Sequence, residues 1–142
     1  METRIRVAAL ILDGDRVLLV SSGRPGYLVP PGGGHERPET LEDGVVRETM
    51  EEAGLSIQCG ELVGYRELLR PERFELELYF RAQLLQNPDS FDGVSEEDRT
   101  VQWVDVAALA ETAHFPERLR ELCAHVRDGS AGALNLGRLS IT

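Results

Sequence analysis

The sequence predicts an α/β fold, in which a mixed β-sheet is covered by helices on its sides. Residues 74–81 alternate between apolar and polar side chains, which is typical of a β-strand. Residues 41–53 carry apolar side chains at helical spacing, between a capping residue, Thr40, and a terminating glycine, Gly54. Because further short apolar runs surround this helix, strands and helices are interspersed along the chain, as expected of a sheet packed against helices.

The first strands are predicted from two apolar runs joined by a turn. Residues 5–12 are mainly apolar and end at Asp13-Gly14-Asp15, after which residues 16–20 resume the apolar run. This pattern predicts a β-hairpin. Residues 27–29 form a short strand that leads into a loop rich in proline and glycine at 30–34.

The ends of the first helix are marked by capping residues. Thr40 can cap its N-terminus, with Asp43 as an imperfect capping-box partner, and Gly54 can end it in a left-handed conformation. Helical spacing predicts a buried stripe along this helix, formed by Leu41, Val45, Val46, Thr49 and Met50.

Two long strands are expected next. Residues 57–69 are strand-like, and Gly60 and Gly64 interrupt them in a way that suggests bulges. Residues 74–81 follow, with Phe74, Leu76, Leu78 and Phe80 on one face and Glu75, Glu77, Tyr79 and Arg81 on the other.

The rest of the chain is predicted to form shorter helices and strands. Residues 86–98 are polar and form a loop, 100–104 form a strand, and 106–110 begin a short helix. Pro116 opens a second helix with apolar residues at helical spacing. The glycine-rich residues 128–142 are expected to be a loosely ordered tail.

Length and composition limit the classes of function. The 142 residues are expected to form one domain, 1–142, and the net charge of −10 argues against a nucleic-acid polymer as partner. No apolar stretch is long enough for a membrane span, and the first residues lack the pattern of a signal peptide, so we expect a cytoplasmic protein. Cys59 and Cys123 fit no metal or redox spacing.

Acidic residues gather on one face of the predicted helix. Glu48, Glu51 and Glu52 share that face, where like charges destabilise a helix by a few tenths of a kcal/mol per pair. Something must offset this repulsion, and a divalent cation is the obvious candidate, because carboxylate oxygens suit Mg²⁺ or Mn²⁺. Arg47 lies beside them but cannot act as a base, because its guanidinium stays protonated.

Residues 33–55, which contain these glutamates, resemble the Nudix box. The pattern of this box is G-x5-E-x7-R-E-U-x-E-E-x-G-U, in which U is an aliphatic residue. Thr49 departs from the pattern at an aliphatic position that normally packs the helix onto the core, which affects packing and not chemistry. The lead-in at 29–34 and the late strand at 101–104 also resemble the Nudix (MutT-like) hydrolase superfamily. The positions that match the box are Gly33, Glu39, Arg47, Glu48, Glu51, Glu52, Gly54 and Leu55.

The resemblance implies a Nudix-type α/β/α sandwich and Mg²⁺-dependent hydrolysis of a diphosphate bond, with Mn²⁺ as an alternative metal. The substrate would be a nucleoside diphosphate linked to another moiety, such as ADP-ribose, or a nucleoside triphosphate or deoxynucleoside triphosphate. Carried over by position, the metal ligands are the backbone carbonyl of Gly32 and the side chains of Glu48, Glu51 and Glu52.

The resemblance also implies the catalytic residues, which are Glu51, Glu52, Glu97 and Arg47. Arg47 is expected to pair with Glu39 and a helix glutamate and so to fix the orientation of the carboxylates. Glu97, in an acidic loop, is our first candidate for the general base. Glu96 is second, and a box glutamate is a further alternative. His35 is a weaker candidate for contacting phosphate or carrying a proton.

The substrate, its binding residues and the oligomeric state stay open at this stage. Pro71, 16 residues beyond Leu55, is similar to a proline of the ADP-ribose-hydrolysing group. A homodimer is possible. The main alternative function is a non-catalytic Nudix-like module that senses a nucleotide, but such modules commonly lose box glutamates that are all present here. A related isoprenoid-diphosphate isomerase would need a cysteine in an ordered motif, and neither Cys59 nor Cys123 lies in one.

Overall fold

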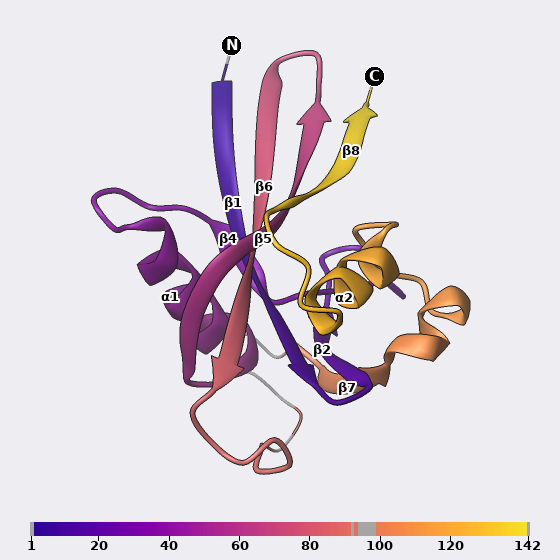
Figure 1. Ribbon diagram of the computed structural model, residues 1–142. Coiled ribbons are helices and arrows are strands. Elements are labelled where there is room, and N and C mark those ends of the chain that lie inside the picture. The colour runs from indigo at the N-terminus through magenta and orange to yellow at the C-terminus, as the bar shows by residue number, and fades with distance from the viewer. Residues whose placement is uncertain (1, 92, 94–98, 142) are drawn as a thin grey trace.

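The computed structural model describes residues 2–91, 93 and 99–141 (Figure 1). Along the chain it contains β1 (Glu2–Asp13), β2 (Arg16–Ser21), β3 (Leu28–Val29), β4 (Gly32–Gly34), α1 (Leu41–Ala53), β5 (Ile57–Leu69), β6 (Arg73–Leu84), β7 (Val101–Asp105), the 3₁₀ helix η1 (Val106–Glu111), α2 (Leu119–Arg127) and β8 (Leu134–Ser140).

The strands form a mixed sheet in which β1 is the central element. The order is β3-β2-β1-β6-β5-β8, with β4 paired to β1 and β7 paired to β2. β1 runs parallel to β6, and β5 runs parallel to β8, whereas the other pairs are antiparallel. The predicted hairpin is confirmed, because Leu12 and Asp13 at the end of β1 pair with Val17 and Arg16 of β2.

Two hydrophobic cores lie on opposite faces of this sheet. Val7 of β1 packs in one core with Val45 of α1. Leu10 of β1, three residues along, packs in the other core with Leu119 and Leu122 of α2. Alternate residues of a strand point to opposite faces, so α1 and α2 cover different sides of the sheet, as Figure 1 shows. The predicted α/β/α sandwich with a mixed sheet is confirmed.

α1 begins and ends where its capping residues predict. The hydroxyl of Thr40 accepts a hydrogen bond from the backbone N–H of Asp43 at 3.1 Å, and Gly54 ends the helix at a φ of 68°. Val45 and Thr49 are fully buried, as predicted. Thr49 donates its hydroxyl proton to the carbonyl of Val45 at 2.8 Å, which satisfies its polar atom inside the core.

Leu41 is partly buried against the same core, but the prediction is wrong for Val46 and Met50. Val46 and Met50 are 37% and 40% exposed, while Glu48 and Glu52 are buried in their place. The helix is rotated because it lies very close to β1: a Cβ on Gly44 would lie 3.3 Å from a methyl of Val7. Gly44, Glu48 and Glu52, one turn apart, therefore face inward, toward β1 and the glycine strand β4.

β5 and β6, the two long strands that the sequence predicts, pair with each other in antiparallel orientation. The register of β5 against β6 shifts between Cys59 and Leu62 and again before Gly64, so the expected bulges are confirmed. The alternation of β6 is less simple than its pattern indicates. Glu75 and Tyr79, on its polar face, are buried, because β6 lies between β1 and β5 with both of its faces partly covered.

The C-terminal residues correct a second expectation. Instead of a loose tail, Leu134–Ser140 forms β8 and pairs in parallel with β5. Leu136 is buried in the core that contains α2, and this contact anchors the strand. The preceding turn is held by His125, whose Nε2 lies 2.8 Å from the carbonyl of Gly132. Within the part of the chain described, no helix is long and apolar enough to cross a membrane.

Candidate functional site

Arg47 organises the acidic face of α1. Its Nε and Nη2 donate to the two carboxylate oxygens of Glu39 at 3.0 and 2.9 Å. Its Nη1 donates to Glu48 at 2.9 Å and to Glu51 at 3.2 Å, and Nη2 also donates to the carbonyl of Gly34 at 3.1 Å. The predicted pairing of Arg47 with Glu39 and with helix glutamates is confirmed. One guanidinium therefore joins the glycine strand, the following loop and the helix.

Glu39 is held in its ionised form. The hydrogen bonds from Arg47, helped by one from the backbone N–H of Glu36 at 2.9 Å, lower the pKa of Glu39 to about 2. In turn, the hydrogen bonds of Glu39 and then Glu48 raise the pKa of Arg47, although its partial burial acts in the opposite direction. Glu39 and Arg47 are therefore both charged at neutral pH.

Two glycines of β4 allow the backbone to approach the helix and β1. A Cβ on Gly33 would lie 2.4 Å from the carboxyl carbon of Glu48, and one on Gly32 would lie 2.3 Å from the carbonyl oxygen of Val7. A side chain at Gly32 would clash with the backbone of β1, and a side chain at Gly33 would push the Glu48 carboxylate away. β4 thus places a stretch of bare backbone against the carboxylate of Glu48.

Glu51 and Glu52 differ in their surroundings. The side chain of Glu51 is 44% exposed, whereas Glu52 is buried. The Oε2 atom of Glu52 lies 3.0 Å from Nε of Arg99, which precedes β7, and Nη1 of Arg99 donates to the carbonyl of Ser21 at 2.8 Å. The sequence analysis missed Arg99, because no spacing relates it to the box.

The donors on this face have the right chemistry for a hard divalent cation. Glu48, Glu51 and Glu52 offer carboxylate oxygens, and Gly32 lies in the strand that contacts Glu48 through Gly33. In the described residues, no group of three or more carboxylate, histidine or cysteine side chains is positioned to hold a metal as the side chains stand. The carboxylates contact guanidinium groups instead, so a metal would have to exchange with them.

The other candidates are placed differently. Glu97 and Glu96, the first two candidates for the general base, lie outside the described residues, so their assignment stays a prediction. The ring of His35 has its Nε2 2.7 Å from the carbonyl of Glu39, which ties it to the loop backbone. A phosphate contact by His35 would have to come from its other nitrogen or replace this bond.

A second charged cluster, which the sequence analysis also missed, lies on the α2 side of the sheet. Arg66 donates to Glu77 at 2.7 Å and to Glu117 at 3.0 Å, and the hydroxyl of Tyr79 donates to the same oxygen of Glu77 at 3.0 Å. Arg6 lies 3.7 Å from the second oxygen of Glu77. Burial, followed by the charge of Glu77, raises the pKa of Tyr79 well above its usual value.

This cluster borders a small cavity beside the loop that leads into β4. The cavity has a volume of about 40 Å³, and Pro30 and Phe115 form part of its apolar wall. Phe115 stacks on Tyr27 with ring centroids 4.7 Å apart, and the guanidinium of Arg24 lies 4.3 Å from the Tyr27 ring centre. The α2 side of the site thus presents arginine, aromatic and carboxylate groups near the glycine strand.

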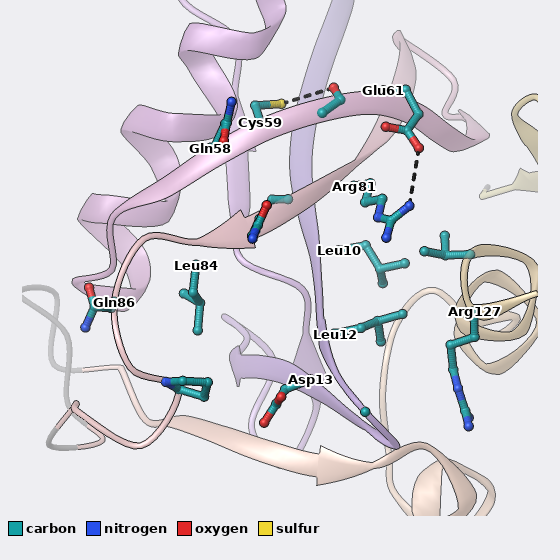
Figure 2. Close-up of a pocket in the computed structure, with 16 residues that line it drawn as sticks. Leu10, Leu12, Asp13, Gln58, Cys59, Glu61, Arg81, Leu84, Gln86 and Arg127 are labelled. Carbon is teal, nitrogen blue, oxygen red and sulfur yellow. Dashed lines mark hydrogen bonds and ion pairs between the residues drawn. The ribbon is translucent and has the colours of Figure 1, made fainter. Parts of the chain in front are cut away.

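A much larger cavity, of about 820 Å³, lies at the far end of the same sheet face (Figure 2). Leu10 and Leu12 of β1 line it together with Arg81 of β6 and Arg127 of α2, and no box glutamate does. Cys59 also lines it, and burial raises the pKa of its thiol to about 11. The larger of these two cavities therefore does not lie at the acidic face of α1.

A sequence model of the NUDIX domain matches residues 2–125. Mouse diphosphoinositol polyphosphate phosphohydrolase 3-alpha is 48% identical over 54 residues, which are 37% of this chain. The match spans only about a third (33%) of that relative's length.

Solved structures show the same fold. A NUDIX hydrolase from Nitrosomonas europaea aligns over 99% of this chain and 81% of its own, with a TM-score of 0.73 and 24% identity. An ADP-ribose pyrophosphatase from Streptococcus suis aligns over 93% of this chain and 98% of its own, with a TM-score of 0.70 and 19% identity. The NUDIX domain match covers most of this chain, including the whole acidic face of α1, and the chain therefore belongs to the NUDIX family.

Proposed function

We propose that the protein is a Mg²⁺-dependent hydrolase, with Mn²⁺ as an alternative, that cleaves a diphosphate bond in a nucleotide. The substrate is a nucleoside diphosphate linked to another moiety, such as ADP-ribose, or a nucleoside triphosphate. The observation that supports this best is the arrangement of Glu48 and Glu51 on Arg47, with Glu48 against the bare backbone of Gly33. Family membership supports the reaction class, since named relatives are a phosphohydrolase and a pyrophosphatase.

The net charge makes a cation necessary for this reaction. The chain carries a charge of −10, and the acidic face would repel a diphosphate. Glu48, Glu51 and Glu52, with the carbonyl of Gly32, would hold the divalent ion. When bound, the ion supplies positive charge next to the phosphate oxygens and makes water more acidic.

The protein's own groups then have separate tasks. Arg47 holds Glu48 and Glu51 through one guanidinium, which limits the orientations of both carboxylates. Glu52 is buried and restricted, whereas Glu51 is exposed enough to accept a proton from water. Glu97 stays our first candidate for the general base, with Glu51 as the alternative within the box.

The variable part of the substrate is proposed to bind on the α2 side of the sheet. Phe115 and Tyr27 offer aromatic surface, and Arg24 and Arg6 offer positive charge that suits phosphate. We include ADP-ribose and diphosphoinositol polyphosphates among the candidate substrates, because the names of two similar proteins mention these compounds. A cytoplasmic location and a homodimer stay predictions.

The decisive experiment is a substrate panel with Mg²⁺, in which phosphate or nucleotide release is measured. The panel contains nucleoside triphosphates, nucleoside diphosphates, ADP-ribose, nucleotide sugars, dinucleoside polyphosphates and diphosphoinositol polyphosphates. We expect Glu52→Gln to lower the turnover of the preferred compound by at least about a hundredfold.

The matched control is Glu42→Gln, which removes an exposed carboxylate from the first turn of the same helix. It should retain activity within about twofold, because Glu42 does not belong to the carboxylate cluster. Tight nucleotide binding without turnover of any compound would instead favour the nucleotide-sensing module.

A further inference from the structure

Arg99 lies outside the Nudix box of residues 33–55 but contacts Glu52, the last glutamate of that box. Nε of Arg99 is 3.0 Å from Oε2 of Glu52, and Nη1 donates to the carbonyl of Ser21 at 2.8 Å. Ser21 is the last residue of β2, whereas Glu52 lies in the last turn of α1. The guanidinium therefore connects the end of β2 to the acidic face of the helix.

The backbone beside Arg99 is held by the sheet. The N–H of Ser21 donates to the carbonyl of Thr100 at 2.9 Å, and the N–H of Thr100 donates to the hydroxyl of Ser21 at 3.0 Å. β7 then continues this pairing, with Val101 opposite Val20. The starting point of the Arg99 side chain is thus set by the pairing of β2 and β7, independently of α1.

The ion pair has a clear role in the protein without metal. The carboxylate of Glu52 is buried, and a buried charge without a counter-charge is strongly unfavourable. The Arg99 guanidinium supplies that counter-charge. A divalent cation would supply it as well, and two cations beside one carboxylate repel each other.

We propose that Arg99 competes with the divalent cation for the carboxylate of Glu52, and so sets the affinity of the site for metal. Arg99 is a positioning residue, because it contacts a proposed metal ligand. The proposal rests on the function proposed above. Metal binding breaks the ion pair between Arg99 and Glu52, and the guanidinium stays protonated throughout.

The test is direct measurement of Mn²⁺ binding to the full chain by calorimetry, without substrate. We expect Arg99→Gln to bind Mn²⁺ about threefold to tenfold more tightly than the unmodified protein, because a partly buried competing charge is removed. Arg99→Lys keeps the charge and should stay within about twofold of the unmodified protein. The charge-matched control is Arg81→Gln, an exposed residue of β6 with a 3.8 Å ion pair to Glu61, whose affinity should also stay within about twofold.

Thermal unfolding gives a second measurement that does not depend on activity. Without metal, Arg99→Gln should melt at a lower temperature than the unmodified protein, because the buried carboxylate of Glu52 loses the counter-charge that Arg99 supplies. Mn²⁺ at the same saturating concentration should raise the melting temperature more in the variant than in the unmodified protein, because the stabilisation by a ligand grows with the logarithm of its concentration divided by Kd.

The outcomes separate this inference from the function on which it rests. If the unmodified protein binds Mn²⁺ and Arg99→Gln binds it equally or more weakly, the competition is overturned while the metal chemistry stands. If Arg81→Gln tightens binding as much as Arg99→Gln, net charge explains the effect and the inference is overturned. If the unmodified protein binds no Mn²⁺, the proposed metal chemistry is itself overturned, and this inference with it.

Discussion

Arg47 and Arg66 each hold a carboxylate cluster, but on opposite faces of the sheet and in different surroundings. The side chain of Arg66 is only 7% exposed, and Glu77 and Tyr79 beside it are largely buried. The side chain of Arg47 is 24% exposed, and Glu51, one of its partners, is open to solvent. The buried cluster is expected to support mainly the fold, whereas the open cluster can exchange its carboxylates with a cation and support chemistry.

The largest expected effect is on stability, at the buried cluster. Arg66→Leu should lower the free energy of unfolding by about 3–5 kcal/mol, because Glu77 keeps its buried charge without its main partner. The melting temperature should fall by roughly 10 °C, measured by calorimetry or circular dichroism.

The matched variant for this prediction is Glu117→Gln. It removes the exposed partner of the same arginine and should cost less than about 1 kcal/mol. If Arg66→Leu and Glu117→Gln destabilise equally, burial is not what distinguishes the Arg66 cluster from the Arg47 cluster.

The next effect is on activity, at the open cluster. Arg47→Gln should lower kcat/KM by about tenfold to a hundredfold, because Glu48 and Glu51 lose the group that orients them. Arg47→Lys should recover little of the lost kcat/KM, since an ammonium group cannot reproduce the two parallel hydrogen bonds to Glu39. Steady-state kinetics on folded protein measures both. A loss of activity that only follows the loss of folded protein would show that Arg47, too, is mainly structural.

The smallest effect concerns acid stability and Glu39. The pKa of Glu39 is lowered from 4.5 to about 2, chiefly by hydrogen bonds from Arg47, so folding favours its ionised form. Its contribution to stability is fully present above pH 4.5 and is lost as the pH falls toward 2. Glu39→Gln should therefore reduce the fall in melting temperature between neutral pH and pH 2, as measured by calorimetry across that range. Parallel curves for the variant and the unmodified protein would contradict this prediction.

Much of the fold could be predicted because its signals are local. Thr40 and Gly54 mark the ends of α1, and the hairpin turn after β1 is visible in three residues. The failures are also physical. Val46 and Met50 fit helical spacing, but the close approach of Gly44 to β1 turns another face inward. β8 was missed because a short, glycine-containing segment becomes a strand only when the edge of β5 is there to pair with it.

The same division holds for the candidate site. The sequence by itself determined that Arg47 lies beside Glu48 and Glu51, because these residues share one helix, where spacing dictates distance. The resemblance to the Nudix box added the pairing of Arg47 with Glu39. Only the tertiary structure decided that Arg99 meets Glu52 and that Arg66 meets Glu77. Those pairs depend on the register of neighbouring strands and on how α1 packs on the sheet. No local pattern encodes such distances, because they arise when segments far apart in the chain are brought together by burial of the two cores.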